Sequence, residues 1–324
     1  MRTNSIFLKK LAVFILLVLG MNTMLNVLYD RWIFFHRLNR HQDQQFENYS
    51  DTLKYLMLGN SHDMINPDII GNSFCYVSPR ELYLQTYYKF RYILEKTNKK
   101  PENILLSIDP VNFSPKAETD IMFDGYWRKY LDYKELAHEY HDPSYFLRWL
   151  TGNFFSYVGG YQYIFKTLIY IKFDISKIQN GYLPQRNFKN FAKETNRGNL
   201  GLERATAYLA SYSDNSDLGA VKYYGRILDL CRKYNIRPIL LRMPLTDEYL
   251  EHAGKMVNLE KLDRAIIAVS RIHCPNFRLF DFRNEFHGKP EYFFNADHVN
   301  STGAIIISRK IKKELEQESD NNPR

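Results

Sequence analysis

The chain has 324 residues, of which 45% are hydrophobic and 25% are charged. This composition excludes a disordered chain and supplies enough apolar material for one large domain, or for one domain with an insertion. The formal net charge is +8, but Lys and Arg are spread along the chain without a dense basic run, so we expect a solvated basic surface and no nucleic-acid binding.

Residues 11–28 form a nearly continuous apolar stretch that follows Arg2, Lys9 and Lys10. At about 1.5 Å per residue in a helix, this stretch just spans a hydrocarbon core of roughly 30 Å. No small-x-small cleavage site follows it, so a retained anchor is favoured over a cleaved signal peptide. A buried core helix is the alternative, but the terminal position and the basic flank favour a membrane. We therefore expect residues 1–35 to be a membrane anchor through residues 11–28.

The anchor is followed by aromatic residues and then by a polar segment. Trp32, Phe34 and Phe35 are typical of side chains at a membrane interface. Residues 36–52 are mostly polar, and we interpret them as a tether between the anchor and a domain over residues 53–319.

From residue 53 onward, short β-prone runs alternate with helical patterns. This alternation predicts an α/β protein whose parallel sheet is covered on both faces, wound in the flavodoxin-like manner with its strand exits on one edge. The expected strands are 53–58, 73–77, 103–108, 237–242 and 277–282, and the expected helices are 81–96, 218–234 and 259–270.

Residues 114–217 interrupt the alternation and are rich in Tyr, Phe and Trp. We expect a mainly helical insertion that follows the third strand and lies beside the edge where the strands exit. Its aromatic side chains could form a lid or a platform for sugar rings, but packing inside the protein is the more economical interpretation.

Two motifs bear on chemistry. Gly59-Asn60-Ser61-His62 directly follows the first strand, and Asp297-His298 begins a motif over residues 297–304. A serine on a sharp turn after a strand can act as a nucleophile when a distant loop supplies a histidine base. Each motif alone would be an ordinary turn or helix cap. Together they predict Ser61 as nucleophile and His298 as base.

The two motifs resemble those of the SGNH (GDSL-type) hydrolase superfamily. The resemblance covers residues 53–114 and 236–308, and it is closest to a membrane-anchored branch related to the D-alanyl transfer protein and the alginate O-acetylation proteins. It implies a three-layer α/β/α fold, serine acyl chemistry and a body on the extracytoplasmic side of the cytoplasmic membrane. The charges that flank the apolar stretch do not settle this orientation, since Arg31, Arg37 and Arg40 rival those before it.

The sequence departs from the superfamily at the residue that orients the histidine. The superfamily has Asp three residues before the His, where this chain has Asn295. Three arrangements remain open: Asp297 orients His298, the site works as a Ser-His dyad assisted by Asn295 or a carbonyl, or the protein is a weak or inactive relative. An Asn accepts a hydrogen bond but cannot offset the charge of an imidazolium.

The tetrahedral intermediate of acyl transfer also needs hydrogen-bond donors for its oxyanion. We expect the Ser61 backbone N–H to be one donor, with Ser78 after the second strand and Asn112 after the third as further candidates. His62 could line the site, but a surface position is the simpler expectation.

We expect no cofactor and no metal. His138-x-x-His141 lacks a third ligand and favours a solvated helix end. Cys75, Cys231 and Cys274 lack the paired spacing of a metal site and allow at most one disulfide.

The expected function is that of a membrane-anchored serine esterase or acyltransferase. The expected substrates are O-acyl groups of a cell-envelope polysaccharide or another acyl donor, and a membrane acyltransferase is a possible partner. The alternative is a non-catalytic envelope protein that binds glycan or a partner within an acyl-transfer assembly, which Asn295 favours.

Overall fold

The computed structural model describes residues 2–29, 38–49, 52–63, 65–78, 81–113, 126–154, 179–182, 190–210, 212 and 221–321. The chain divides into two compact units. The first comprises Met1–His41 and Met122–Ile175, and the second comprises Gln42–Ile121 and Ser176–Arg324. The predicted insertion is therefore split between the units, because residues 114–121 and 176–217 belong to the second unit.

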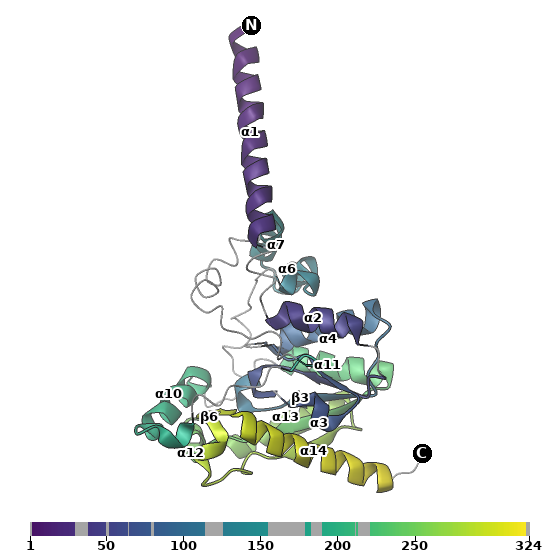
Figure 1. The fold of residues 1–324 in the computed structure, drawn as a ribbon, viewed down its shortest axis with the longest axis vertical. Helices are drawn as coiled ribbons and strands as arrows, with labels where there is room; N and C mark the ends of the chain where they lie inside the picture. The colour runs from purple at the N-terminus through teal and green to yellow at the C-terminus, as the bar shows by residue number, and fades with distance from the viewer. Residues whose placement is uncertain are drawn as a thin grey trace. The chain divides into compact units, whose positions relative to one another are not determined.

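The first unit begins with helix α1 (Arg2–Leu28), drawn in purple in Figure 1. Its Ile6–Leu28 segment is long and apolar enough to cross a membrane. Apolar side chains along it are exposed, Leu16 and Leu17 by 67% each, so α1 is not a helix of the core. Trp32, Phe34 and Phe35 lie outside the described residues.

The other described elements of the first unit are η4 (Trp127–Lys129), α6 (Tyr133–Glu139) and α7 (Ser144–Phe154), so this part of the insertion is helical as predicted. Tyr126 and Trp127 are buried, and their ring centroids lie 4.8 Å apart. These two aromatic side chains are core residues. His138 and His141 are exposed at the end of α6, as expected for a solvated helix end.

The second unit contains the predicted parallel sheet. Its strands pair all in parallel in the order β2-β1-β3-β4-β5, which is the doubly wound order of flavodoxin-like folds. Most of their side chains are buried, which explains why the strands are short apolar runs without alternation. The bounds are β1 Tyr55–Leu58, β2 Ser73–Cys75, β3 Asn103–Ser107, β4 Arg237–Arg242 and β5 Arg278–Asp281.

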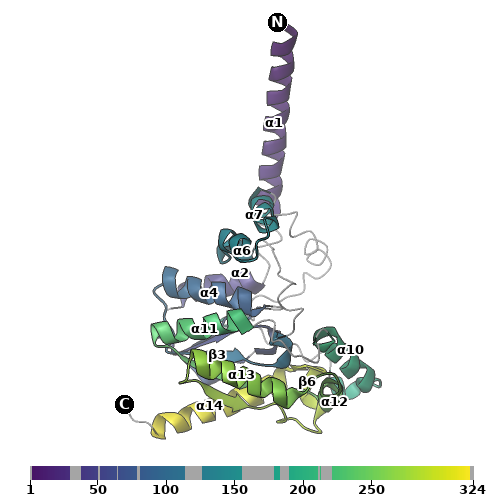
Figure 2. The same ribbon diagram turned by 180° about the vertical axis from the view of Figure 1, so that it is seen from behind.

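Helices cover both faces of the sheet, which gives three layers (Figure 1, Figure 2). Helices α4, α11 and α13 lie on one face, and α3 and α14 lie on the other. Beyond the strand exits, α10 packs against α12. The bounds are α3 Pro67–Ile70, α4 Tyr83–Lys96, α10 Arg197–Leu209, α11 Val221–Tyr234, α12 Asp247–Met256, α13 Leu259–His273 and α14 Ser301–Asn321.

Six short elements complete the described part of the second unit. They are η2 (Ser61–Asp63), η3 (Pro110–Phe113), η6 (Phe191–Lys193), η7 (Pro290–Tyr292) and the antiparallel pair β6 (Phe293–Asn295) and β7 (His298–Val299). None of these elements is predicted by the sequence pattern, because each is too short to show a period.

Much of the segment predicted as a tether is helix α2 (Leu38–Asn48), and this is a correction. Gln42 is buried, and its Nε2 atom donates to the backbone oxygens of Val77 at 2.9 Å and Gly181 at 2.7 Å. Tyr76 donates its hydroxyl to the buried Asp43 carboxylate. Gln42 and Asp43 are therefore buried because they form hydrogen bonds at the β2 edge of the sheet. The polarity of the segment alone predicted that its side chains would be solvated.

We expect Gln42→Ala to lower the free energy of unfolding by about 1–3 kcal/mol, because buried carbonyl groups lose their donor. The measurement is the urea midpoint of the full chain in detergent. Asn48→Ala is the matched control, since Asn48 is exposed at the end of the same helix. Equal midpoints for the two variants would contradict this role of Gln42.

Candidate active site

Ser61 lies at the point where the winding of the sheet reverses. It opens η2 just after β1, and η3 follows the neighbouring strand β3, so both exits meet at the carboxyl edge of the sheet, where open α/β proteins place their sites. The turn between β1 and Ser61 requires Gly59, whose φ of 129° is in the region that favours glycine.

The motif over residues 297–304 forms β7, which pairs with β6, and the start of α14. Asn300 Oδ1 accepts the backbone N–H groups of Thr302 and Gly303 at 3.1 Å each, so Asn300 caps the helix. A Cβ atom on Gly303 would lie 2.5 Å from the Tyr292 backbone oxygen, so only glycine permits this approach. These contacts hold the loop that carries His298.

A hydrogen-bonded chain joins the three predicted catalytic residues. Ser61 Oγ lies 2.8 Å from His298 Nε2, and His298 Nδ1 lies 2.9 Å from Asp297 Oδ1. With the Nδ1 proton donated to the carboxylate, Nε2 is free to accept the hydroxyl proton of the serine. The geometry is that of a nucleophile, a base and an orienting acid.

Asn295 also contacts the base, so two of the open arrangements coexist. Its Oδ1 atom lies 3.1 Å from His298 Nδ1 and accepts the backbone N–H groups of His298 at 2.8 Å and Asp297 at 3.2 Å. Asn295 thus holds the turn, and the turn lets the adjacent side chains of Asp297 and His298 converge. The negative charge that Asn295 lacks is supplied by Asp297.

Asp297 is only 1% exposed, and a buried carboxylate must be paired. Arg204 of α10 supplies a cation, with Nε 2.9 Å from Oδ1 and Nη2 2.8 Å from Oδ2. Burial by itself would raise the pKa of Asp297, but the hydrogen bond from His298 and the nearby positive charges hold this pKa well below its ordinary range. Asp297 is therefore ionised at neutral pH.

His62 was expected at the surface, and this expectation is wrong. Its side chain is buried, its ring centroid lies 4.2 Å from that of His298, and its Nε2 lies 3.6 Å from Asp297 Oδ2. Burial, together with the neighbouring His298, lowers the pKa of His62 from 6.5 to about 3. His62 is thus a neutral wall of the site, placed there by its position after Ser61.

The predicted oxyanion donors have different surroundings. The Ser61 backbone N–H opens a helical turn, a position with no acceptor within the turn, so its role stays a prediction. The backbone N–H of Ser78 donates to the Gly59 oxygen at 3.0 Å, so it already has an acceptor, and the role of Ser78 also stays a prediction.

Asn112 lies beside the site and faces Asn60. Because Asn60 Oδ1 accepts the His62 N–H at 2.9 Å, its Nδ2 is the atom that donates to Asn112 Oδ1. Asn112 Nδ2 is then directed to Ser107, 3.3 Å from its backbone oxygen. Asn112 therefore orients Asn60, and donation by Asn112 to an oxyanion stays a prediction.

His62, Asp297 and His298 have ligand atoms close enough to share a metal ion. The guanidinium of Arg204 already contacts both oxygens of Asp297, and Ser61 contacts Nε2 of His298. A bound cation would have to displace Arg204, so the donor set fits acyl chemistry better than metal binding.

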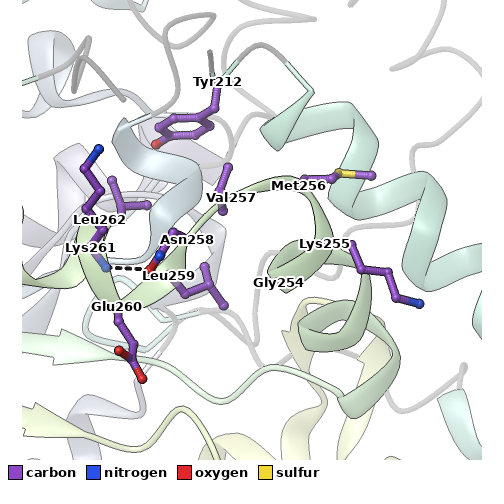
Figure 3. A pocket seen from close by; sticks show the side chains of 10 residues that line it. All are labelled: Tyr212, Gly254, Lys255, Met256, Val257, Asn258, Leu259, Glu260, Lys261 and Leu262. Carbon is purple, nitrogen blue, oxygen red and sulfur yellow. Dashed lines mark hydrogen bonds between the residues drawn. The ribbon is translucent and has the colours of Figure 1, made fainter. Parts of the chain in front are cut away.

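A cavity of about 560 Å³ lies at the turn between α12 and α13 (Figure 3). It is lined by Tyr212 and by residues 254–262. Within this segment Asn258 caps α13, because its Oδ1 atom accepts the Lys261 N–H at 2.9 Å. Tyr212 donates its hydroxyl to the Pro110 oxygen at 2.6 Å. Ser61, Asp297 and His298 do not line this cavity.

No family model matches the sequence, and no curated protein matches it at the threshold of the search. The resemblance to SGNH hydrolases therefore rests on the motifs and on the geometry that they form. Sequence reasoning missed Arg204 and the burial of His62. An Arg in a helix of an insertion has no local signal, because its partner lies 93 positions away.

The buried neutral His62 predicts a pH dependence of stability. An unfolded chain protonates His62 below about pH 6.5, whereas the folded chain keeps it neutral down to about pH 3. The contribution of the neutral His62 to the free energy of unfolding is fully present above about pH 6.5 and is lost as the pH falls toward 3. Between about pH 7.5 and about pH 5, wild type should lose roughly 2 kcal/mol more stability than His62→Gln. Urea midpoints at the two pH values measure this, and parallel losses would refute it.

Proposed function

We propose that this protein is a membrane-anchored serine esterase or O-acyltransferase of the SGNH type. The single observation that supports the proposal is the chain of hydrogen bonds from Ser61 through His298 to the buried carboxylate of Asp297. Ser61 comes from the exit of β1, and His298 and Asp297 come from a hairpin more than two hundred residues later. Acyl transfer through serine requires a nucleophile, a base and an orienting acid in this arrangement.

The proposed reaction has two halves. Ser61 Oγ attacks the acyl carbonyl carbon while His298 Nε2 takes the hydroxyl proton, and the Asp297 carboxylate stabilises the imidazolium. The C–O bond to the leaving alcohol then breaks, and His298 returns the proton to the alcohol oxygen. Water or a sugar hydroxyl attacks the Ser61 ester with His298 again as base, which releases an acid or a new ester and restores Ser61.

The proposed substrates are O-acyl groups of a cell-envelope polysaccharide, and the proposed location of the body is the extracytoplasmic side of the cytoplasmic membrane. The apolar α1 helix supports attachment to a membrane, and the resemblance of the two motifs supports the substrate class. A membrane acyltransferase that supplies the acyl group is a proposed partner.

The alternative is a non-catalytic protein of the same fold that binds glycan or a partner. Its main support is that Asn295 stands where the superfamily has an acid. Asp297, whose Oδ1 lies 2.9 Å from His298 Nδ1, is an acid at a different position in the sequence. The alternative predicts that no turnover of an acyl ester depends on Ser61.

We expect the full chain in detergent to hydrolyse p-nitrophenyl acetate and to react with a fluorophosphonate at Ser61. Ser61→Ala and His298→Ala should each lower kcat by about 10⁴-fold or more, because they remove the nucleophile or its base. Intact-mass spectrometry locates the label. Absence of both Ser61-dependent turnover and Ser61 labelling would contradict the enzyme proposal for these probes.

Asp297→Asn and Asn295→Ala separate the two contacts to His298. We expect Asp297→Asn to lower kcat by about 10⁴-fold, as the comparable change does in a serine protease, because the imidazolium loses its counter-charge. Asn295→Ala should cost less, about 10- to 100-fold, because it removes the hydrogen bonds that hold the turn but leaves the counter-charge of Asp297 in place. Steady-state kinetics decide the order, and a larger loss for Asn295→Ala would show that the amide, not the carboxylate, orients the base.

A further inference from the structure

We propose that Arg204, on helix α10 of the insertion, is a positioning residue for the catalytic histidine, and that close packing at Gly201 sets its place. The inference deepens the proposed function and rests on it, since Arg204 would act through Asp297 on His298. No motif of the sequence assigns a role to either residue.

The contacts of Arg204 are those of a two-point clamp. Nε and Nη2 of the guanidinium lie 2.9 Å and 2.8 Å from different oxygens of Asp297. A hydrogen bond to one oxygen and an ion-pair contact to the other restrict the rotation of the carboxylate, which a single ammonium group cannot do. The clamp turns Oδ1 of Asp297 toward His298 Nδ1. Catalysis requires that Asp297 accept the proton of this nitrogen in a hydrogen bond.

Gly201 explains why α10 is close enough for this clamp. A Cβ atom on Gly201 would lie 2.8 Å from the backbone carbon and 2.9 Å from the backbone oxygen of Glu248, at the start of α12. Gly201 and Arg204 are three residues apart and so lie on the same face of α10. Any side chain at position 201 would push that face away from α12 and move Arg204 off Asp297.

Arg204 also has an electrostatic effect on the base. Its Nη2 atom lies 3.5 Å from His298 Nδ1, and a positive charge at this distance opposes formation of the imidazolium. The other groups that face the His298 ring are Asp297, which favours the imidazolium, Asn295, which is uncharged, and His62, which is neutral. Removal of Arg204 therefore leaves the charge of Asp297 unopposed.

The first test compares Arg204→Ala, Arg204→Lys and Arg197→Ala by steady-state kinetics with p-nitrophenyl acetate. Arg197 is the matched control, because it lies on the same helix but its Nε atom pairs with Glu248, 2.9 Å from Oε1, and not with Asp297. We expect Arg204→Ala to lower kcat by about 10- to 100-fold with KM nearly unchanged, as for a displaced catalytic group. Its acidic limb of kcat against pH should move to higher pH.

Arg204→Lys should keep the acidic limb of wild type, because the charge remains, and still lose rate, because the two-point contact is gone. Arg197→Ala should keep both the rate and the pH profile. The proposal would be overturned if Arg204→Ala and Arg197→Ala had equal kinetics, or if the pH profile of kcat were the same in Arg204→Ala as in wild type.

The second test uses two glycines of α10. Gly201→Ala should lower kcat, although Ala is the better helix former, because the new methyl group collides with α12. Gly198→Ala is the control, since a Cβ atom there has nothing within 4 Å. Loss of rate in both variants or in neither would overturn the role of Gly201.

A third measurement separates this inference from the proposed function. The ring nitrogens of His298 can be followed by NMR at one pH in the full chain labelled at histidine, with His298→Gln to assign its signal. We expect the Nδ1 signal, which reports the hydrogen bond to Asp297, to shift in Arg204→Ala and to stay in Arg197→Ala, whether or not the chain turns over an ester. Absent turnover would then defeat the proposed function, whereas an unmoved Nδ1 signal would defeat the inference.

Discussion

The buried carboxylate of Asp297 is the constraint on which the described site depends. A charge that is almost fully excluded from water must be paired, and the cost of leaving it unpaired amounts to several kcal/mol. Its neighbours come from three separate parts of the chain: Arg204 from the insertion, His62 from the exit of β1 and His298 from the hairpin. Satisfying one charge therefore brings a helix, a strand exit and a loop to the same point, and the Ser61–His298 contact is formed as part of that arrangement.

The sheet provides the fixed frame for this point. Its strands are parallel and mostly buried, so helices must cover both faces, and their exits gather at one edge. The β2 side of the sheet would expose unpaired carbonyl groups, and α2 satisfies them through Gln42. Rigidity matters because a nucleophile and a base that are misplaced by about 1 Å lose most of their benefit. The insertion completes the frame where α10 meets α12.

The strands, three of the covering helices and the pairing of Ser61 with His298 could be predicted because their signals are local. Each strand is an apolar run, and each site motif combines turn formers with a residue of known chemistry. The role of α2 could not be predicted, because a polar helix and a polar tether have the same composition. His62 could not be placed either, because burial of a histidine depends on what covers it.

By itself, the sequence determined the class of fold, the apolar N-terminal helix and the presence of a serine at a strand exit and of a histidine in a distant motif, since periodicity and composition are properties of short segments. Only the tertiary structure decided which acid contacts His298. Asn295 stands at the expected spacing, yet Asp297 also contacts the ring, because Asn295 shapes the turn and Arg204 holds the carboxylate. The physical reason is that a charge is placed by its partners in space, and here the decisive partner is remote in sequence.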